Sequence, residues 1–285
     1  VCRACAMLGF PRWASRCASL PRGPCLTDPF IVAGRTCIGP NTLPARPAPC
    51  MVKLLKLAPL FASVRGWTSS AMSNDGLVDN LLRDGVVKSQ EVDQVLRKLD
   101  RANYVADRSV AYQDSPQPIG LGVTISAPHM HAFALERLWE YAQNGRRVLD
   151  VGVGSGYLAA AFGHLVGEDG KCFGIDCHAQ LVDLARENVL KDQGSEFSSR
   201  LDFRVGDGWK GLPEEGPFDA IHVGAAAAEL PAALLEQLAP GGRLVIPVGP
   251  EGGNQELIEV DKDKDGDLTQ RSLLGVRYVP LVKSS

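Results

Sequence analysis

Short apolar runs alternate with helix-forming runs between residues 147 and 248, and this alternation limits the possible folds more than any other feature of the sequence. Strands are predicted at 147–151, 172–175, 201–205, 218–223 and 243–248, and helices at 157–166, 179–191 and 230–238. Apolar strands separated by helices are typical of a parallel sheet whose crossover helices cover both faces. We therefore predict a Rossmann-like α/β domain.

The flanking segments complete this prediction. Two amphipathic helices are expected at 76–84 and 89–99, the second with Ser89 as its N-cap, and a third after Ser126. Two further apolar runs predict an antiparallel hairpin at the sheet edge, 256–260 and 273–281. The prediction is a mostly parallel seven-stranded sheet in a catalytic domain of residues 72–285, with an N-terminal helical cap at 76–128.

Charge separates the first 71 residues from the rest of the chain. They contain nine Lys and Arg and one acid, a net charge of +8, which leaves −11 for residues 72–285. An acidic domain disfavours a nucleic-acid surface, so we predict no nucleic-acid partner. Six of the eight cysteines fall within the first 50 residues, so no disulfide framework is expected in the domain.

The segment 1–71 is interpreted as a disordered leader or a targeting segment. From Met51, lysines flank the apolar run 54–64, a pattern typical of organelle or secretory targeting, while a tail without an address explains it equally well. The run is too short for a membrane span. Met51 and Met72 are both candidate starts. Starting at Met72 predicts a cytoplasmic protein, and using the leader predicts an organellar or secretory one.

Residues 148–157 form a strand, a glycine-rich turn and the start of a helix. Gly152, Gly154 and Gly156 would let the backbone approach a ligand closely beside unsatisfied helix N–H groups. Dinucleotide enzymes use the spacing G-x-G-x-x-G, whereas here Tyr157 stands where their third glycine would be. The spacing therefore favours S-adenosylmethionine over NAD.

Acidic residues stand at the ends of the first three strands. Asp176 follows Gly156 by 20 residues and can accept hydrogen bonds from both ribose hydroxyls of an adenosine ligand, with a helix N-cap as its alternative role. Asp207 and Gly208 are expected beside the adenine, Asp207 alternatively as a simple turn residue. Asp150 either faces the ligand's ammonium group or braces the glycine loop.

Four segments resemble one enzyme family closely. They are DSPQPIGLGVTISAPHMH at 114–131, DAIHVGAAA at 219–227, LAPGGRL at 238–244 and PVGP at 247–250. They are similar to the motifs of protein-L-isoaspartate (D-aspartate) O-methyltransferase, and the likeness covers 77–281. The resemblance implies a class I S-adenosylmethionine-dependent methyltransferase fold. It also implies methylation of the free carboxylate of L-isoaspartyl or D-aspartyl residues in damaged polypeptides, followed by repair through a succinimide.

The resemblance also implies roles for individual residues. Ser126 matches the family's active-site serine, and Thr124 with Ser126 would contact the substrate. Residues expected around the cofactor or its entrance are Ile119, Gly120, Leu121, Gly122, His129, Asp176, Asp207 and Gly208. Val282 stands where relatives often carry a hydroxyl residue, and many animal relatives continue in a polar tail beyond this point, so we expect different cofactor contacts at this end.

The chemistry agrees with this assignment. A carboxylic acid with a pKa of about 3.9 is ionised at neutral pH, so the nucleophile needs no general base. His129 and His131 are therefore not required as bases. Ser126 is expected to orient the carboxylate, helped by N–H groups at the start of the helix containing Pro128. His222 is expected to be a satisfied core histidine. The acidic run 261–267 predicts a hairpin turn and no metal site.

Two alternatives from other classes remain. The first is a noncatalytic S-adenosylmethionine-binding module for isoaspartyl recognition or an adaptor role, which the intact Ser126 and glycine loop disfavour. The second is an NAD-dependent dehydrogenase, which the glycine spacing disfavours. No oligomer interface is evident in the sequence, so a monomer is expected.

Overall fold

The computed structural model describes residues 69–283 and the backbone of residues 53–54, all within one compact unit, Pro49–Ser285. Nearly all of the predicted leader, including Met51, lies outside the described residues. Among the residues described, no helix is long and apolar enough to cross a membrane.

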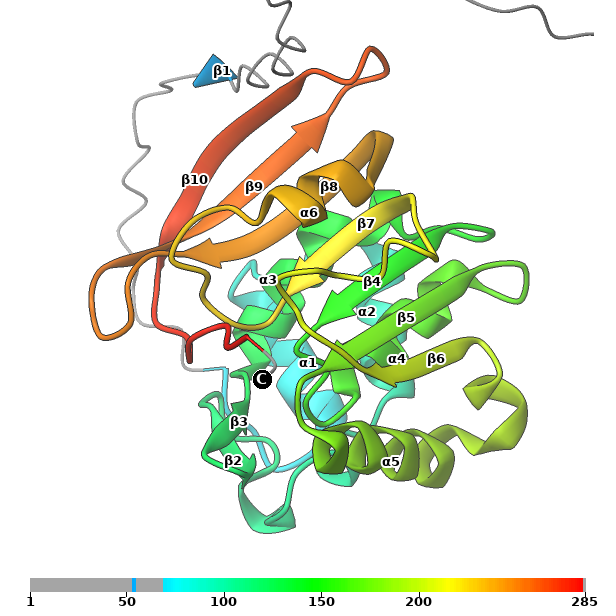
Figure 1. Ribbon diagram of the computed structural model, residues 1–285. Helices are drawn as coiled ribbons and strands as arrows, with labels where there is room; N and C mark the ends of the chain where they lie inside the picture. The colour runs from blue at the N-terminus through cyan, green and yellow to red at the C-terminus, as the bar shows by residue number, and fades with distance from the viewer. Residues whose placement is uncertain (1–52, 55–68, 284–285) are drawn as a thin grey trace, which may run out of the picture. The chain divides into compact units, whose positions relative to one another are not determined.

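Eight strands form the main sheet, in the order β1-β10-β9-β8-β7-β4-β5-β6 (Figure 1). Their bounds are β1 (Lys53–Leu54), β4 (Arg147–Val151), β5 (Lys171–Asp176), β6 (Leu201–Val205), β7 (Phe218–Val223), β8 (Leu238–Val248), β9 (Gln255–Lys262) and β10 (Leu268–Val276). Strands β4 to β8 are mutually parallel, and β9 pairs antiparallel with both β8 and β10. The mostly parallel sheet with an antiparallel edge hairpin is therefore confirmed, and β1 adds a two-residue parallel pairing to β10 that was not predicted.

The chain reverses direction across the sheet at β4. From β4 it proceeds to β5 and then β6 on one side, and it returns to place β7 on the other side of β4. The connections that leave the carboxyl ends of the strands run in opposite directions at such a switch point, and the crevice between them is where ligands bind in open α/β sheets. The sheet order thus places the expected site at the ends of β4, β5 and β7.

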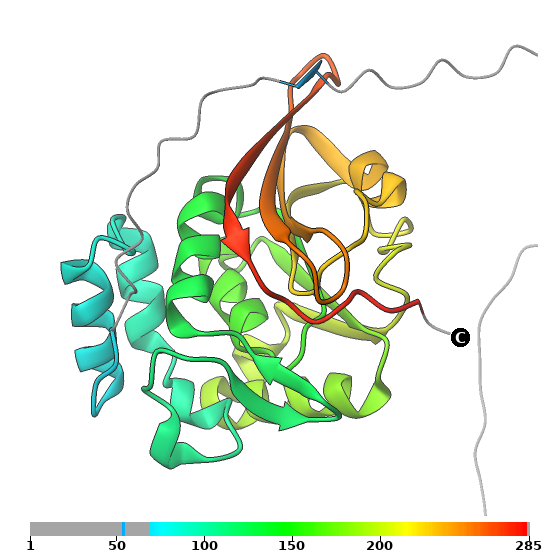
Figure 2. The ribbon, with the colours of Figure 1, turned by 90° about the vertical axis from the view of Figure 1, so that its left-hand side faces the viewer.

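Helices cover both faces of the sheet, as predicted, but unequally. Their bounds are α1 (Asn74–Arg83), α2 (Gln90–Lys98), α3 (Pro128–Leu138), α4 (Tyr157–Val166), α5 (Ala179–Ser198) and α6 (Ala232–Gln237). One core joins α3, α4 and α5 to the sheet, with α1 and α2 as an outer layer (Figure 2). In the second core, on the opposite face, α6 is the one helix that packs on the strands, and the loops after β6 and β7 supply the rest of the cover.

The capping prediction for α2 is confirmed. The Ser89 hydroxyl accepts a hydrogen bond from the amide of Val92 at 3.4 Å. The same hydroxyl donates to Glu136 of α3 at 2.8 Å, and Glu136 also accepts from the Ser89 amide at 2.9 Å. The cap therefore also fastens α2 to α3.

Two parts of the secondary structure differ from the prediction. The stretch before α3, for which no strand was predicted, contains a hairpin of β2 (Gln117–Gly120) and β3 (Val123–Ile125). The second edge strand was placed at 273–281, whereas β10 ends at Val276. It begins earlier because Asp263 accepts amide hydrogen bonds from Asp265 and Asp267, both at 2.9 Å, and closes the turn tightly.

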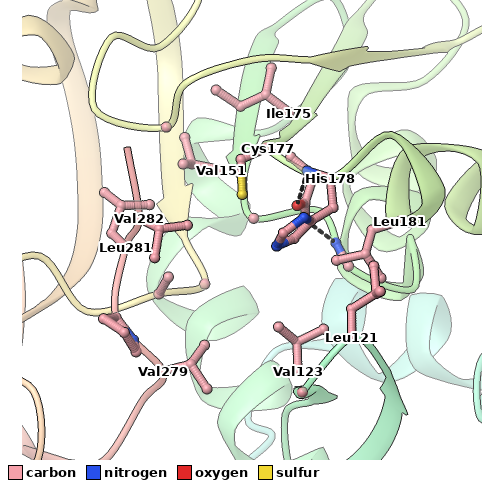
Figure 3. A pocket seen from close by; sticks show the side chains of 18 of the residues that line it. Leu121, Val123, Val151, Ile175, Cys177, His178, Leu181, Val279, Leu281 and Val282 are labelled. Atoms are coloured by element: carbon pink, nitrogen blue, oxygen red, sulfur yellow. Dashed lines mark hydrogen bonds between the residues drawn. The ribbon is translucent and has the colours of Figure 1, made fainter. Parts of the chain in front are cut away.

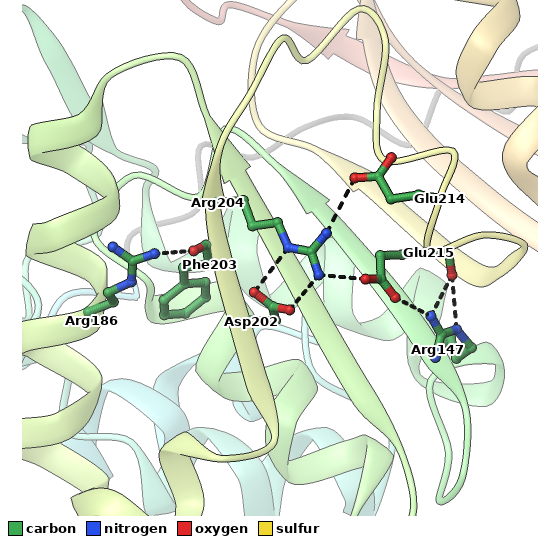
Figure 4. Close-up of polar contacts among 7 residues, drawn as sticks. All are labelled: Arg147, Arg186, Asp202, Phe203, Arg204, Glu214 and Glu215. Atoms are coloured by element: carbon green, nitrogen blue, oxygen red, sulfur yellow. Dashed lines mark hydrogen bonds and ion pairs between the residues drawn. The ribbon is translucent and has the colours of Figure 1, made fainter.

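An ion-pair network anchors the loop between β6 and β7 (Figure 4). Arg204 of β6 lies 2.7 Å from Asp202 and 2.5 Å from Glu215 of this loop, and Arg147 of β4 lies 3.0 Å from the same glutamate. Both guanidinium groups lie over the ring of Phe173, at 4.8 and 5.8 Å from its centroid. The network fixes the loop that begins with the predicted adenine-side residues.

Candidate functional site

A cavity of about 380 Å³ opens at the switch point of the sheet (Figure 3). Its walls come from the hairpin β2–β3, the carboxyl ends of β4 and β5, the residues after β7, and the C-terminal segment 279–282. Leu121 and Val123 of the hairpin and Val279 of the C-terminal segment approach the cavity from different sides. A cavity of this size and position is typical of a small-molecule site in an open α/β sheet.

The glycine loop has the backbone conformation that its sequence predicts. Gly152, Gly154 and Gly156 have φ values of +79°, +51° and +83°, which side chains rarely permit. Gly152 and Gly154 line the cavity. Gly156 does not, and a Cβ atom there would lie 3.1 Å from Ala185, so this glycine permits α4 to pack against α5.

Asp176 occupies the end of β5 with its carboxylate oriented by two backbone amides. Its side chain accepts hydrogen bonds from the amide of Gly154 at 3.2 Å and from that of His178 at 3.1 Å (Figure 3). Each carboxylate oxygen keeps a lone pair for a further donor. Asp176 therefore faces the cavity, but it is not the N-cap of α5, because that position is His178, which makes no side-chain capping hydrogen bond.

The two residues expected beside the adenine differ in their surroundings. Gly208 lines the cavity, and a Cβ atom there would lie 2.7 Å from both Val151 and Leu281, so only glycine fits. The Asp207 carboxylate accepts the Trp209 amide at 3.0 Å and lies outside the cavity wall. Its hydrogen bond is that of a turn residue.

The hairpin β2–β3 contributes some of the residues expected at the cofactor entrance. Leu121 and Gly122 line the cavity, whereas Ile119 and Gly120 do not. Thr124, which was expected to contact the substrate, lines this cavity as well. Leu121 is 53% exposed and, among the residues described, is the one non-glycine with positive φ, at +50°. Such strain in an exposed apolar residue is common where a ligand is held.

A second, smaller cavity of about 40 Å³ shares the glycine loop and Thr124 with the first. Ser126, Asp150 and His222 all line it. The Asp150 carboxylate lies 2.7 Å from Nδ1 of His222, and both side chains are buried. His222 is thus a satisfied core histidine, as expected, and its partner is one of the predicted cofactor residues.

His131 also lines this inner cavity and is held neutral. Burial, reinforced by the charge of Arg101, lowers the pKa of His131 well below its ordinary value. Its ring stacks on Tyr157 with centroids 5.2 Å apart. The cavity therefore offers no imidazolium at this position, in agreement with a reaction that needs no acid or base from it.

Ser126 lies between the hairpin and α3, half-buried. The N-cap of α3 is Ala127, so the serine hydroxyl is not used for capping. Its carbonyl accepts a hydrogen bond from Nη2 of Arg101 at 2.7 Å. Its hydroxyl also interacts with the phenol of Tyr278, whose pKa is raised by burial to about 12.

The start of α3 corrects one expectation. N–H groups in this first turn were expected to receive an anion together with Ser126, but Pro128 has no N–H and the amide of His129 donates to Asp114 at 3.0 Å. The next amide, that of Met130, donates to the Ala127 carbonyl at 2.9 Å. His129 lines neither cavity, and its Nδ1 lies 2.7 Å from the same Asp114 carboxylate. The amides that would bind an anion are engaged within the protein.

Several lining residues were not predicted. Cys177 and His178 directly follow Asp176, so their place at the end of a strand was a usable signal. The C-terminal residues gave no local signal, because they reach the cavity through hydrogen bonds of Ala226 to Val279 and Leu281, both 2.8 Å. No group of three or more His, Cys, Asp or Glu suited to a metal occurs in the described part of the chain.

Fold and site together define a class. A Rossmann-like sheet with an antiparallel edge hairpin, a glycine loop and an acid at the end of β5 is the arrangement of an S-adenosylmethionine-dependent methyltransferase. Residues 72–285 match the family model of protein-L-isoaspartate(D-aspartate) O-methyltransferase. The chain belongs to this family.

Individual relatives agree with the assignment. The protein-L-isoaspartate O-methyltransferase of Triticum aestivum is 47% identical over 222 residues, covering 77% of this chain and 96% of that protein. Protein-L-isoaspartate O-methyltransferase 1 of Arabidopsis thaliana is 48% identical over 218 residues, covering 75% and 94%. A Plasmodium falciparum structure described as a protein-L-isoaspartate O-methyltransferase, in complex with S-adenosyl-L-homocysteine, superposes with a TM-score of 0.68 at 34% identity, covering 74% of this chain and 99% of that chain.

Proposed function

We propose that this protein is a repair methyltransferase. It transfers the methyl group of S-adenosylmethionine to the free carboxylate of L-isoaspartyl, and of D-aspartyl, residues in damaged proteins and peptides. The observation that carries the proposal is the wall that the two cavities share: the glycine loop borders both, with Asp176 lining the outer cavity and Ser126 lining the inner one.

The residues of the outer cavity fit the cofactor. Asp176 can accept both ribose hydroxyls, Gly208 leaves room for the base, and Gly152 and Gly154 let the backbone approach the methionine portion. S-adenosylmethionine supplies an electrophilic methyl group on its sulfonium. Leu121, Gly122 and Thr124 would border its reactive end on the hairpin side.

The remaining task of the chain is to hold the substrate carboxylate. An isoaspartyl carboxylate is ionised at neutral pH, so no side chain has to remove a proton from it. Ser126 would donate its hydroxyl to one carboxylate oxygen and direct the other toward the methyl group, with Thr124 beside it. Orientation of two reactants in a site that excludes water can lower a barrier by about 7–11 kcal/mol.

The wider biology of the protein follows from the same proposal. We infer that it acts as a monomer on damaged polypeptides. We also infer that it has no nucleic-acid partner, because the domain carries a net charge of −11. A chain that begins at Met72 would be cytoplasmic, and one that keeps a functional leader within 1–71 would be organellar or secreted.

The test is methyl transfer from radiolabelled S-adenosylmethionine to a short peptide containing L-isoaspartate, beside the same peptide with L-aspartate. Ester should form on the isoaspartyl peptide alone. Ser126→Ala should lower kcat/KM about 10- to 100-fold, the loss of a hydrogen bond to a charged group. The matched control, Ser272→Ala at an exposed position of β10, should leave it unchanged. Cofactor binding without methylation of either peptide would instead identify a noncatalytic binding module.

A further inference from the structure

Arg101 is a buried cation that forms no ion pair with any described residue. It begins the 3₁₀ helix Arg101–Asn103, is 0% exposed, and has no carboxylate among the described residues within 4 Å. Its Nε is buried without a hydrogen-bond partner. Burial lowers the pKa of Arg101 to about 10, which still leaves it charged at neutral pH. The Asp114 carboxylate acts on this charge only from beyond ion-pair distance. Burial of a charge without an ion-pair partner is costly, so a functional reason is expected.

The guanidinium contacts three residues of the inner cavity wall. Nη2 donates to the Ser126 carbonyl at 2.7 Å, and Nη1 lies 3.4 Å from Nδ1 of His131. The guanidinium carbon lies 5.5 Å from the centroid of the Tyr157 ring. Because His131 is neutral, its Nδ1 can accept this hydrogen bond, so the contact adds no negative charge. All three contacts leave the positive charge of Arg101 in place.

The described residues that line this cavity include no Lys or Arg. The amides of the first turn of α3 are engaged, as described above, and the one carboxylate in the wall, Asp150, is paired with His222. An anionic substrate that reaches Ser126 therefore meets a wall supported by one buried cation. Peptide 126–127, held by that cation, carries the serine that would contact the substrate.

We propose that Arg101 is a positioning residue for the substrate carboxylate, fixing the Ser126 backbone and holding an unpaired positive charge that favours a carboxylate over a neutral group. This inference rests on the proposed function. It predicts that the protein distinguishes an isoaspartyl peptide from its isoasparaginyl analogue, in which an amide replaces the carboxylate. It also predicts that part of this preference depends on Arg101, although Arg101 does not touch the substrate.

The test measures the dissociation constants of both peptides with S-adenosyl-L-homocysteine present, for the full chain and for Arg101→Met and Arg101→Lys. Arg101→Met should lower the preference for the carboxylate about tenfold, with S-adenosyl-L-homocysteine binding within about twofold. Arg101→Lys should keep the preference within about threefold, because the charge remains. Its kcat should fall, because one ammonium group cannot reproduce the two-pronged contact with Ser126 and His131.

Tyr104→Phe is the matched control for a general loss of stability. It removes a buried hydrogen bond of 2.9 Å to Asp192 beside Tyr157, without touching Ser126. It should lower the melting temperature and leave the preference unchanged. An unchanged preference in Arg101→Met, a lost preference in Arg101→Lys, or an equal loss in Tyr104→Phe would overturn the proposal. A wild-type protein that methylates no isoaspartyl peptide would instead refute the proposed function, since binding preference is measured without turnover.

Discussion

The indole Nε1 of Trp209 donates a hydrogen bond of 2.8 Å to the backbone carbonyl of Leu281. The bond joins the loop after β6 to the C-terminal segment, 72 residues apart in the sequence. Leu281 itself lines the outer cavity and packs against Gly208. One wall of the site is therefore held in place by a contact on its outer side.

Trp209→Phe should weaken cofactor binding. The ring is kept but the hydrogen bond to Leu281 is lost, so the C-terminal wall is less firmly held. A net loss of about 0.5–1.5 kcal/mol corresponds to an increase of about 2- to 10-fold in the dissociation constant of S-adenosyl-L-homocysteine, measured by calorimetry. Trp139→Phe, a half-buried tryptophan remote from the cavity wall, is the control. Equal affinities in the two variants would show that the C-terminal wall does not depend on this bond.

Asp176→Asn should weaken cofactor binding more strongly. The substitution removes the charge offered to the ribose and sets an amide donor against the N–H group of either Gly154 or His178, which bond to different carboxylate oxygens. Hydrogen bonds to charged groups contribute about 1.5–3 kcal/mol, so affinity should fall about 10- to 150-fold. Asp183→Asn, an exposed acid on α5, should bind normally. Unchanged binding in Asp176→Asn would remove this carboxylate from the ribose site.

Gly156→Ala should destabilise the protein more than Gly145→Ala. Both glycines have positive φ, +83° and +81°, so both variants carry a strain of about 1–2 kcal/mol. Only at Gly156 does the new methyl group collide, at 3.1 Å from Ala185, whereas nothing lies within 4 Å at Gly145. Urea unfolding should therefore give a lower free energy of unfolding for Gly156→Ala. Equal values would mean that α4 and α5 can separate at no cost.

Stability should fall as the pH drops below about 6.5. Burial lowers the pKa of His131 in the folded state, so over this range the unfolded chain binds a proton that the folded chain does not. Each histidine with a lowered pKa then reduces the free energy of unfolding by up to about 1.4 kcal/mol per pH unit below pH 6.5. Above this pH the histidine is neutral in both states and the reduction disappears. His164, whose pKa is also lowered by burial, should add to the slope. The measurement is urea unfolding between pH 5.5 and 7.5.

His131→Asn isolates the part due to His131. The Asn side-chain oxygen can still accept from Arg101, but it cannot be protonated in this range. The variant should be less stable than wild type at pH 7.5, with a shallower decline toward pH 5.5. Parallel curves for the two proteins would show that His131 is protonated equally in the folded and unfolded states.

Local sequence determined the elements of this fold. The apolar runs, the N-cap Ser89 and the glycine spacing each act over a few residues, and conformational preferences at that range are set by neighbours in the chain. Asp176 could be assigned for the same reason, because the carboxyl end of a parallel strand is where ligands bind. The family motifs added Ser126, whose chemical role no local pattern could supply.

The tertiary structure decided which of these elements meet. The register of β4 against β7 sets Asp150 opposite His222, 72 residues away, and so forms a buried pair where the sequence left the aspartate unassigned. Val279 and Leu281, predicted in the edge strand, lie beyond the end of β10 and line the outer cavity because they bond to Ala226. Such contacts depend on which strands become neighbours. That choice is made by burial of apolar faces across the whole domain, and no single segment of the sequence specifies it.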